Sequence, residues 1–160
     1  MRSSLLIGLL LLLAPPAMAG EADNFLKICA VQQDATACET DAKQFTKWYA
    51  AALKRDYTSQ RNVAFTFSSG RSAAVVRDLV QGCAWRMVII ASGSPEVDGG
   101  DQMNLQTECG RLSAVEMARA KARATAITKT IAAGGEPAKP AAAGKPKKPT
   151  QELDGTAEPL

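Results

Sequence analysis

Apolar residues recur three or four positions apart along most of the chain, and this spacing places them on one face of an α-helix. The pattern predicts helices almost throughout, about six in all. We expect them to begin at Asp23 as an N-cap, at the capping box Thr36–Glu39, after Asp56, at a Ser72 cap, after Asp101 and at the capping box Ser113–Glu116. Gly70, Gly93 and the Gly134-Gly135 pair are expected to end the third, fourth and sixth helices. The sequence therefore predicts an all-α fold.

Each predicted helix carries a stripe of residues expected to face the core. The first three stripes are Phe25, Leu26, Ile28 and Cys29; then Ala42, Phe45, Trp48, Tyr49, Ala52 and Leu53; then Gln60, Val63, Ala64 and Phe67. The last three are Val76, Leu79, Val80, Cys83, Ala84, Met87, Val88 and Ala91; then Met103, Leu105, Cys109 and Leu112; then Met117, Ala120, Ala124, Ile127 and Ile131. The runs Phe65-Thr66-Phe67 and Val88-Ile89-Ile90 are also compatible with strands, but their long helical surroundings favour helix.

The first 19 residues have the pattern of a cleaved signal peptide. Arg2 supplies a positive start, Leu5 to Leu13 is apolar, and Ala17-Met18-Ala19 offers the small residues that signal peptidase reads. The alternative is a membrane anchor, but a bilayer span needs about 20 apolar residues and this run is roughly half as long. We therefore expect cleavage before Gly20 and a mature protein that is periplasmic or secreted, with no membrane span.

Four cysteines follow the signal, and an oxidising compartment allows them to pair. Four cysteines permit three connectivities. Residues equidistant from a turn come together in an antiparallel helix pair, which favours one of the three. Cys29 and Cys38 flank the first predicted turn symmetrically, and Cys83 and Cys109 each lie 13 residues from Glu96. We therefore expect Cys29–Cys38 and Cys83–Cys109 bonds.

Composition removes several classes of function. The chain contains no histidine, so neither an imidazole base nor a histidine metal ligand is available. No Cys-x-x-Cys redox motif occurs. The loop Asp98-Gly99-Gly100-Asp101 lacks the flanking ligands of an EF-hand, so we interpret it as a helix cap rather than a calcium site. We expect no cofactor, metal or catalytic residue, and predict that the protein is not an enzyme.

Basic residues concentrate in the last predicted helix. Between positions 111 and 129, Glu116 is the one acidic residue beside Arg111, Arg119, Lys121, Arg123 and Lys129. We interpret the cluster as a solvated face, because it lacks the interleaved aromatic residues of a nucleic-acid site. Nucleic acid is therefore not an expected partner, whereas an acidic protein or an anionic envelope polymer could bind weakly.

The composition changes at position 134. Residues 134–160 are rich in Ala, Pro, Gly and Lys, and cannot bury enough apolar surface to offset the entropy of ordering. We expect a disordered tail whose Lys145, Lys147 and Lys148 could touch an anionic envelope polymer. Residues 20–133 then form one helical domain.

Parts of this domain resemble the Sel-one-like repeat, a relative of the tetratricopeptide helix pair. The matching stretches are Trp48-Tyr49-Ala50-Ala51-Ala52, Asp56, Gln60, Asn62-Val63-Ala64 and Gly70, followed by Ala84-Trp85-Arg86 and Ile90-Ala91-Ser92-Gly93. Trp48 and Trp85 lie 37 residues apart, close to the period of such repeats. The segment from Leu112 to Ala124 is similar to a closing helix of the family.

The resemblance implies a short α/α solenoid that binds a protein or peptide in a groove and is not catalytic. Candidate partner-binding residues are Trp48, Tyr49, Trp85 and Arg86, whose types are common at binding hot spots. In the repeat pattern, however, the aromatic positions pack between helices. Two alternatives remain: an envelope hydrolase, or a regulator of one, with Glu108 and Glu116 as a carboxylate pair, and a helical carrier of an apolar ligand with a closed cavity.

Overall fold

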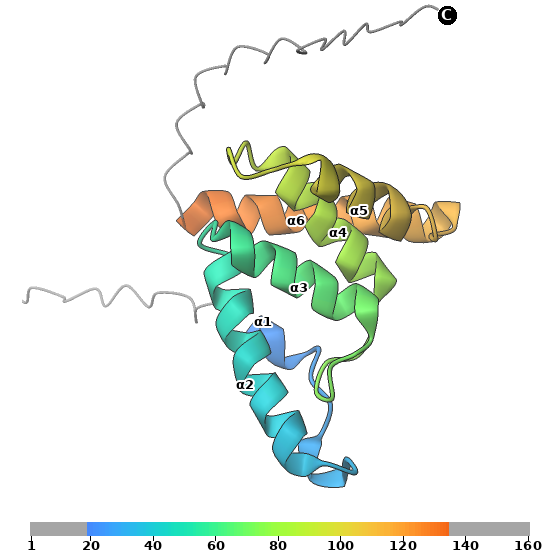
Figure 1. Ribbon diagram of the computed structural model, residues 1–160. Helices are drawn as coiled ribbons and strands as arrows, with labels where there is room; N and C mark the ends of the chain where they lie inside the picture. The colour runs from blue at the N-terminus through green and yellow to red at the C-terminus, as the bar shows by residue number, and fades with distance from the viewer. Residues whose placement is uncertain (1–18, 135–160) are drawn as a thin grey trace, which may run out of the picture.

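The computed structural model describes residues 19–134, and every regular element in that range is a helix (Figure 1). The elements are α1 (Ala19–Asp23), a 3-10 turn η1 (Cys29–Val31), α2 (Ala35–Ala52), α3 (Tyr57–Ser69), α4 (Leu79–Ala91), α5 (Gly99–Cys109) and α6 (Ala114–Gly134). The predicted all-α stack is confirmed. Apart from Ala19, the predicted signal peptide lies outside the described residues, as does the predicted tail after Gly134.

α4 is the central helix of the stack. It packs against α3, α5 and α6, whereas α2 packs mainly on α3, α1 and η1 (Figure 1). Its sequence explains this position, since a helix that is apolar on all sides is stable only when neighbours cover every side. Its buried residues are Gly82, Cys83, Ala84, Trp85, Arg86, Val88 and Ile89. Gly82 allows α3 to approach closely, because a Cβ atom at this position would lie 3.1 Å from the Cβ of Ser68.

Aromatic side chains from successive helices form the main core. Tyr49 on α2 meets Trp85 on α4 edge to face, with ring centroids 5.6 Å apart. Phe45 on α2 meets Phe67 on α3 in the same way at 5.3 Å. Such pairs contribute about 0.5–1.5 kcal/mol each beyond the burial of their area. The core therefore joins α2, α3 and α4 into one unit.

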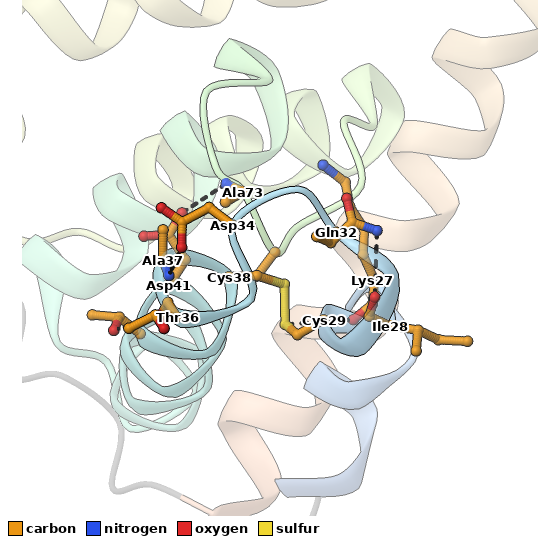
Figure 2. The surroundings of a disulfide bond; sticks show 12 residues. Lys27, Ile28, Cys29, Gln32, Asp34, Thr36, Ala37, Cys38, Asp41 and Ala73 are labelled. Carbon is orange, nitrogen blue, oxygen red and sulfur yellow. Dashed lines mark hydrogen bonds between the residues drawn. A yellow bond between two sulfur atoms is a disulfide. The ribbon is translucent and has the colours of Figure 1, made fainter.

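Both predicted disulfides are confirmed. Cys29 is bonded to Cys38, with Cα atoms 5.4 Å apart, and the bond joins η1 to the first turn of α2 (Figure 2). Cys83 is bonded to Cys109, with Cα atoms 5.0 Å apart, and this bond joins α4 to the end of α5. The symmetry of the cysteines about two turns was therefore a correct guide to their pairing.

The prediction that a first helix begins at Asp23 is wrong, because the helix α1 ends at this residue. The following backbone is extended and pairs with the segment before α4 through an isolated bridge between Leu26 and Val75. The N–H of Lys27 donates to the carbonyl of Ala74 at 2.7 Å. Long-range backbone hydrogen bonds thus replace the helical ones that local spacing predicts.

Other helix starts also differ from prediction. α4 does not start at Ser72: its N-cap is Asp78, whose carboxylate accepts from the N–H groups of the first turn. Val76 therefore precedes the helix and is exposed. α2 is capped by Asp34 rather than by a box at Thr36. In each case an aspartate forms the N-cap in place of the predicted hydroxyl residue.

α5 begins earlier than predicted. Asp98 is its N-cap, and Asp101 lies in the first turn and completes a capping box with Asp98. The interpretation of this loop as a helix cap is confirmed. Met103, predicted to face the core, is instead 67% exposed.

The remaining helix ends agree with the sequence. Asp56 caps α3, and Gly70 ends it in the left-handed conformation at φ 65°. Gly93 follows α4 with φ 69°. Ser113 and Glu116 form the predicted capping box of α6, and the α6 stripe is buried at Ala120, Ile127 and Ile131.

Candidate functional site

Two neighbouring hollows lie on either side of α3. The smaller, about 200 Å³, lies between α2 and α3 and includes Trp48 in its lining. The larger, about 470 Å³, lies between α3 and α5 and includes Arg86 and Asn104. The two hollows share Asn62 and Phe65, and Phe65 is 50% exposed between them. We refer to Trp48, Asn62, Phe65, Arg86 and Asn104 as the Phe65 surface.

The helix packing explains the larger hollow. α3 and α5 both pack on α4, and their mutual contact is too slight to close the space between them. α4 therefore forms its floor, where Arg86 is almost fully buried. Arg86 donates from Nε and Nη2 to the two carboxylate oxygens of Glu108, at 3.1 and 2.9 Å. This two-point pairing fixes the plane of the guanidinium.

One nitrogen of Arg86 remains available. Its Nη1 has no hydrogen-bond partner among the described residues, although it is not one of the fully buried unsatisfied atoms. Asn62 and Asn104 add amide donors and acceptors to the same lining. The hollow can therefore form hydrogen bonds with a polar group above its floor.

A second polar cluster stands beside this hollow. The carboxylate of Asp101 on α5 is fully buried and accepts a hydrogen bond of 2.5 Å from the hydroxyl of Tyr57 on α3. Nε of Arg61 lies 3.2 Å from Oδ1 of Asp101, in ion-pair contact but without hydrogen-bond geometry. Burial raises the pKa of Tyr57, and the hydrogen bond to Asp101 adds to the effect. This cluster links the start of α3 to the first turn of α5 beside the larger hollow.

The four predicted partner-binding residues divide into two groups. Trp48 and Arg86 line the two hollows of the Phe65 surface. Tyr49 and Trp85 lie in the core, with 1% and 0% of their surface exposed. Burial raises the pKa of Tyr49, and its hydroxyl accepts a hydrogen bond from Arg123 at 2.8 Å. In this conformation Tyr49 and Trp85 offer no surface to a partner.

Three residues of the Phe65 surface, Asn62, Phe65 and Asn104, were not predicted as site residues, although a signal for Phe65 was present. The stripe predicted for α3 is Gln60, Val63, Ala64 and Phe67, all of which are buried, and Phe65 falls off that stripe. A large apolar residue off the buried face of an amphipathic helix must be exposed. Asn104 gives no comparable signal, because a polar residue on an exposed helix face is unremarkable.

The carboxylates of the hydrolase alternative have structural partners. Glu108 pairs with Arg86, as described above. Glu116 accepts from the backbone N–H and the hydroxyl of Ser113, at 2.9 and 2.7 Å, and these hydrogen bonds lower its pKa. Within residues 19–134, no group of three acidic, cysteine or histidine side chains is arranged to hold a metal ion.

One member of the basic cluster on α6 differs from prediction. Arg123 is half-buried: it forms an ion pair with Glu21, donates to the hydroxyl of Tyr49 and donates to Gln81 at 3.0 Å. It therefore ties α1, α2 and α4 to α6 instead of facing solvent. Arg119, Lys121 and Lys129 are exposed, as expected of a solvated face.

No known protein family, curated protein or solved structure matches this chain. In the described part of the chain, no helix has the length and hydropathy needed to cross a membrane.

Proposed function

We propose that this protein is an extracytoplasmic, non-catalytic scaffold of the Sel-one-like type, which binds a segment of another protein or a peptide at the Phe65 surface. The observation that supports this most directly is the half-exposed Phe65 side chain between two hollows, one lined by Trp48 and the other by Arg86. Aromatic and arginine side chains beside hollows that exclude water are the usual composition of a binding hot spot.

The energetics of Phe65 favour a partner. A phenylalanine side chain can bury about 200 Å², so covering its exposed half would contribute about 2–3 kcal/mol. The amides of Asn62 and Asn104 and the Nη1 group of Arg86 can pair with backbone groups of an incoming segment. The apolar contact would supply affinity, and the polar groups would fix the orientation of the segment.

Other features support the compartment and the class of protein. All four cysteines are disulfide-bonded, which is typical of proteins in oxidising environments such as a periplasm or the cell exterior. The consecutive helices α2 and α3 pack on each other, as do α4 and α5, and such pairs of neighbours resemble the helix pairs of repeat proteins. The pairing of Glu108 with Arg86 favours a structural role for this carboxylate over hydrolysis.

Affinity capture tests the proposal. The oxidised chain from Gly20 onward would be immobilised and exposed to an envelope extract, beside a Phe65→Ala variant. Val115→Ala is the matched control, because Val115 is 71% exposed and lines neither hollow. We expect a specific partner retained by the parent chain and by Val115→Ala, and recovered at least tenfold less by Phe65→Ala, in line with about 2 kcal/mol of lost contact. Equal recovery by the two variants, or no specific partner, would contradict the proposal.

A further inference from the structure

We propose a second binding site, for a small carboxylate with an apolar tail, in the cleft at the C-terminal end of α4. The cleft has a volume of about 290 Å³ and shares no lining residue with the Phe65 surface. Apolar side chains from two helices line it, including Val88 on α4 and Ile131 on α6. Arg55 is the one charged residue of the lining. Such a mixture, mostly apolar with one placed charge, is typical of small-molecule sites.

The guanidinium group of Arg55 is free to bind an anion. Among the described residues its guanidinium has no ion-pair or hydrogen-bond partner, and its Nε is buried without an acceptor. A buried donor without an acceptor is unfavourable and uncommon in folded proteins. A carboxylate is the group whose two oxygens match the guanidinium N–H groups best.

The backbone at Arg55 gives an independent indication. Arg55 has φ 71°, and it is the one non-glycine residue of the described chain with a positive φ. Its N–H donates to the carbonyl of Ala52 at 3.1 Å, and the N–H of Asp56 donates to that of Ala51 at 3.2 Å. This hydrogen-bonding pattern ends many helices, and glycine is the usual residue at its left-handed position. The chain thus has an arginine where glycine would be less strained, and strain of this kind concentrates at functional sites.

The surrounding charge favours an anion. A neighbouring hollow shares Val88, Ala91 and Thr128 with the cleft, and its lining contains Lys121 and Lys129 but no acidic residue. The cleft is larger than the cavity of about 150 Å³ that holds benzene and lies near the lower limit of drug-sized sites. An unbranched carboxylate of about eight carbons fits both the volume and the charge. The cleft is open at the surface, unlike the closed cavity expected for an apolar-ligand carrier.

Calorimetry with octanoate and 1-octanol tests the site on the full oxidised chain. The two probes share the alkyl chain and differ in charge. We expect octanoate to bind at least about tenfold more tightly than octanol, since a hydrogen bond to a charged group contributes about ten- to a hundredfold in affinity. In the Arg55→Gly variant, the affinity for octanoate should fall to the affinity for octanol, and the affinity for octanol should equal that of the parent chain. Glycine suits the left-handed backbone at this position.

A second pair of variants tests the location. Ala132→Phe places a ring in the cleft, because Ala132 is exposed and belongs to the lining; Ala126→Phe adds the same ring on α6 outside it. We expect Ala132→Phe to abolish binding of both probes and Ala126→Phe to leave it unchanged. Equal affinity for octanoate and octanol, an unaltered octanoate affinity in Arg55→Gly, or no binding of either probe to the parent would overturn the proposal. If the parent chain binds no octanoate but self-associates, and Ala132→Phe disrupts this self-association, the proposal is overturned and the cleft is a contact between copies of the chain.

Discussion

Arg86 on α4 and Glu108 on α5 are joined by two parallel hydrogen bonds, beside the disulfide that joins Cys83 and Cys109 on the same two helices. One link is ionic and the other covalent, and they lie within three residues of each other on α4 and are adjacent on α5. Together they fix the spacing of α4 and α5. The width of the larger hollow of the Phe65 surface depends on that spacing.

Removing one partner of this ion pair should be costly. Glu108→Ala leaves the guanidinium of Arg86, only 4% exposed, without its carboxylate. Breaking a buried pair in this way typically costs about 3–5 kcal/mol. Urea unfolding of Glu108→Ala should show a loss in this range.

The double variant Arg86→Met with Glu108→Leu is the control for that experiment. Replacing both charges by apolar side chains of similar size is often neutral, so most of the lost stability should return. If Glu108→Ala unfolds at the same urea concentration as the parent chain, the pair is not structural.

The two disulfides should differ in their contribution and in their accessibility. Loop closure predicts about 2.6 kcal/mol for the bond that spans 9 residues and about 3.5 kcal/mol for the bond that spans 26. Cys83 and Cys109 are buried, whereas Cys29 is partly exposed. Mild reductant should therefore open Cys29–Cys38 first, as thiol labelling and mass spectrometry would show. Simultaneous reduction of both bonds would indicate that α4 and α5 separate readily.

Acid should destabilise the fold through its helix caps. Hydrogen bonding from Ser59 lowers the pKa of Asp56, and hydrogen bonds from Ser113 lower that of Glu116. A carboxylate whose pKa is lower in the folded state than in the unfolded state stabilises the fold at any pH above its unfolded-state pKa, which is about 3.9 for Asp and 4.3 for Glu. This contribution is lost as the pH falls through the folded-state pKa. Urea unfolding should therefore show stability falling below about pH 4.

The variant Asp56→Asn checks the assignment of that acid sensitivity. Asparagine is an equally good N-cap but does not titrate. The variant should have near-parental stability at neutral pH and a shallower loss in acid. An unchanged acid slope would show that Asp56 does not contribute to it.

Arg55→Gly should stabilise the protein. The left-handed backbone costs a non-glycine residue about 1 kcal/mol, and in the described structure the side chain of Arg55 makes no hydrogen bond or ion pair that would be lost. Glycine also increases the freedom of the unfolded chain, so the net gain should be below about 1 kcal/mol. Thermal unfolding measures the change, and a marked destabilisation would show that Arg55 has a packing role.

The sequence predicted the features that depend on local pattern. The helical class, the caps at Asp56 and Ser113 and the stop at Gly93 follow from short-range chemistry. The disulfide pairing followed from the symmetry of the cysteines about turns. This held even though the α-helix predicted around Cys29 does not form, and Cys29 lies in a 3-10 turn instead.

Features that depend on distant segments were not predictable. The extended segment at Leu26 exists because it pairs with Val75, which is remote in sequence. α4 does not begin near Ser72 because the residues that follow it pair with a distant extended segment, where the N–H of Val76 donates to the carbonyl of Phe25 at 3.0 Å. Arg123 is half-buried because Glu21 and Tyr49 come to it from other helices. Contacts of this kind form only when segments that are distant in the sequence pack together.

A photo-reactive residue on α5 tests the central claim most directly. Placed at Asn104, it lies in the larger hollow of the Phe65 surface; placed at Gln102, it lies two residues away on an exposed part of the same helix and outside both hollows. Illumination in the native compartment should cross-link one discrete partner from position 104 and none from position 102. Cross-linking of the same partner from both positions with equal yield, or from neither, would contradict binding at the Phe65 surface.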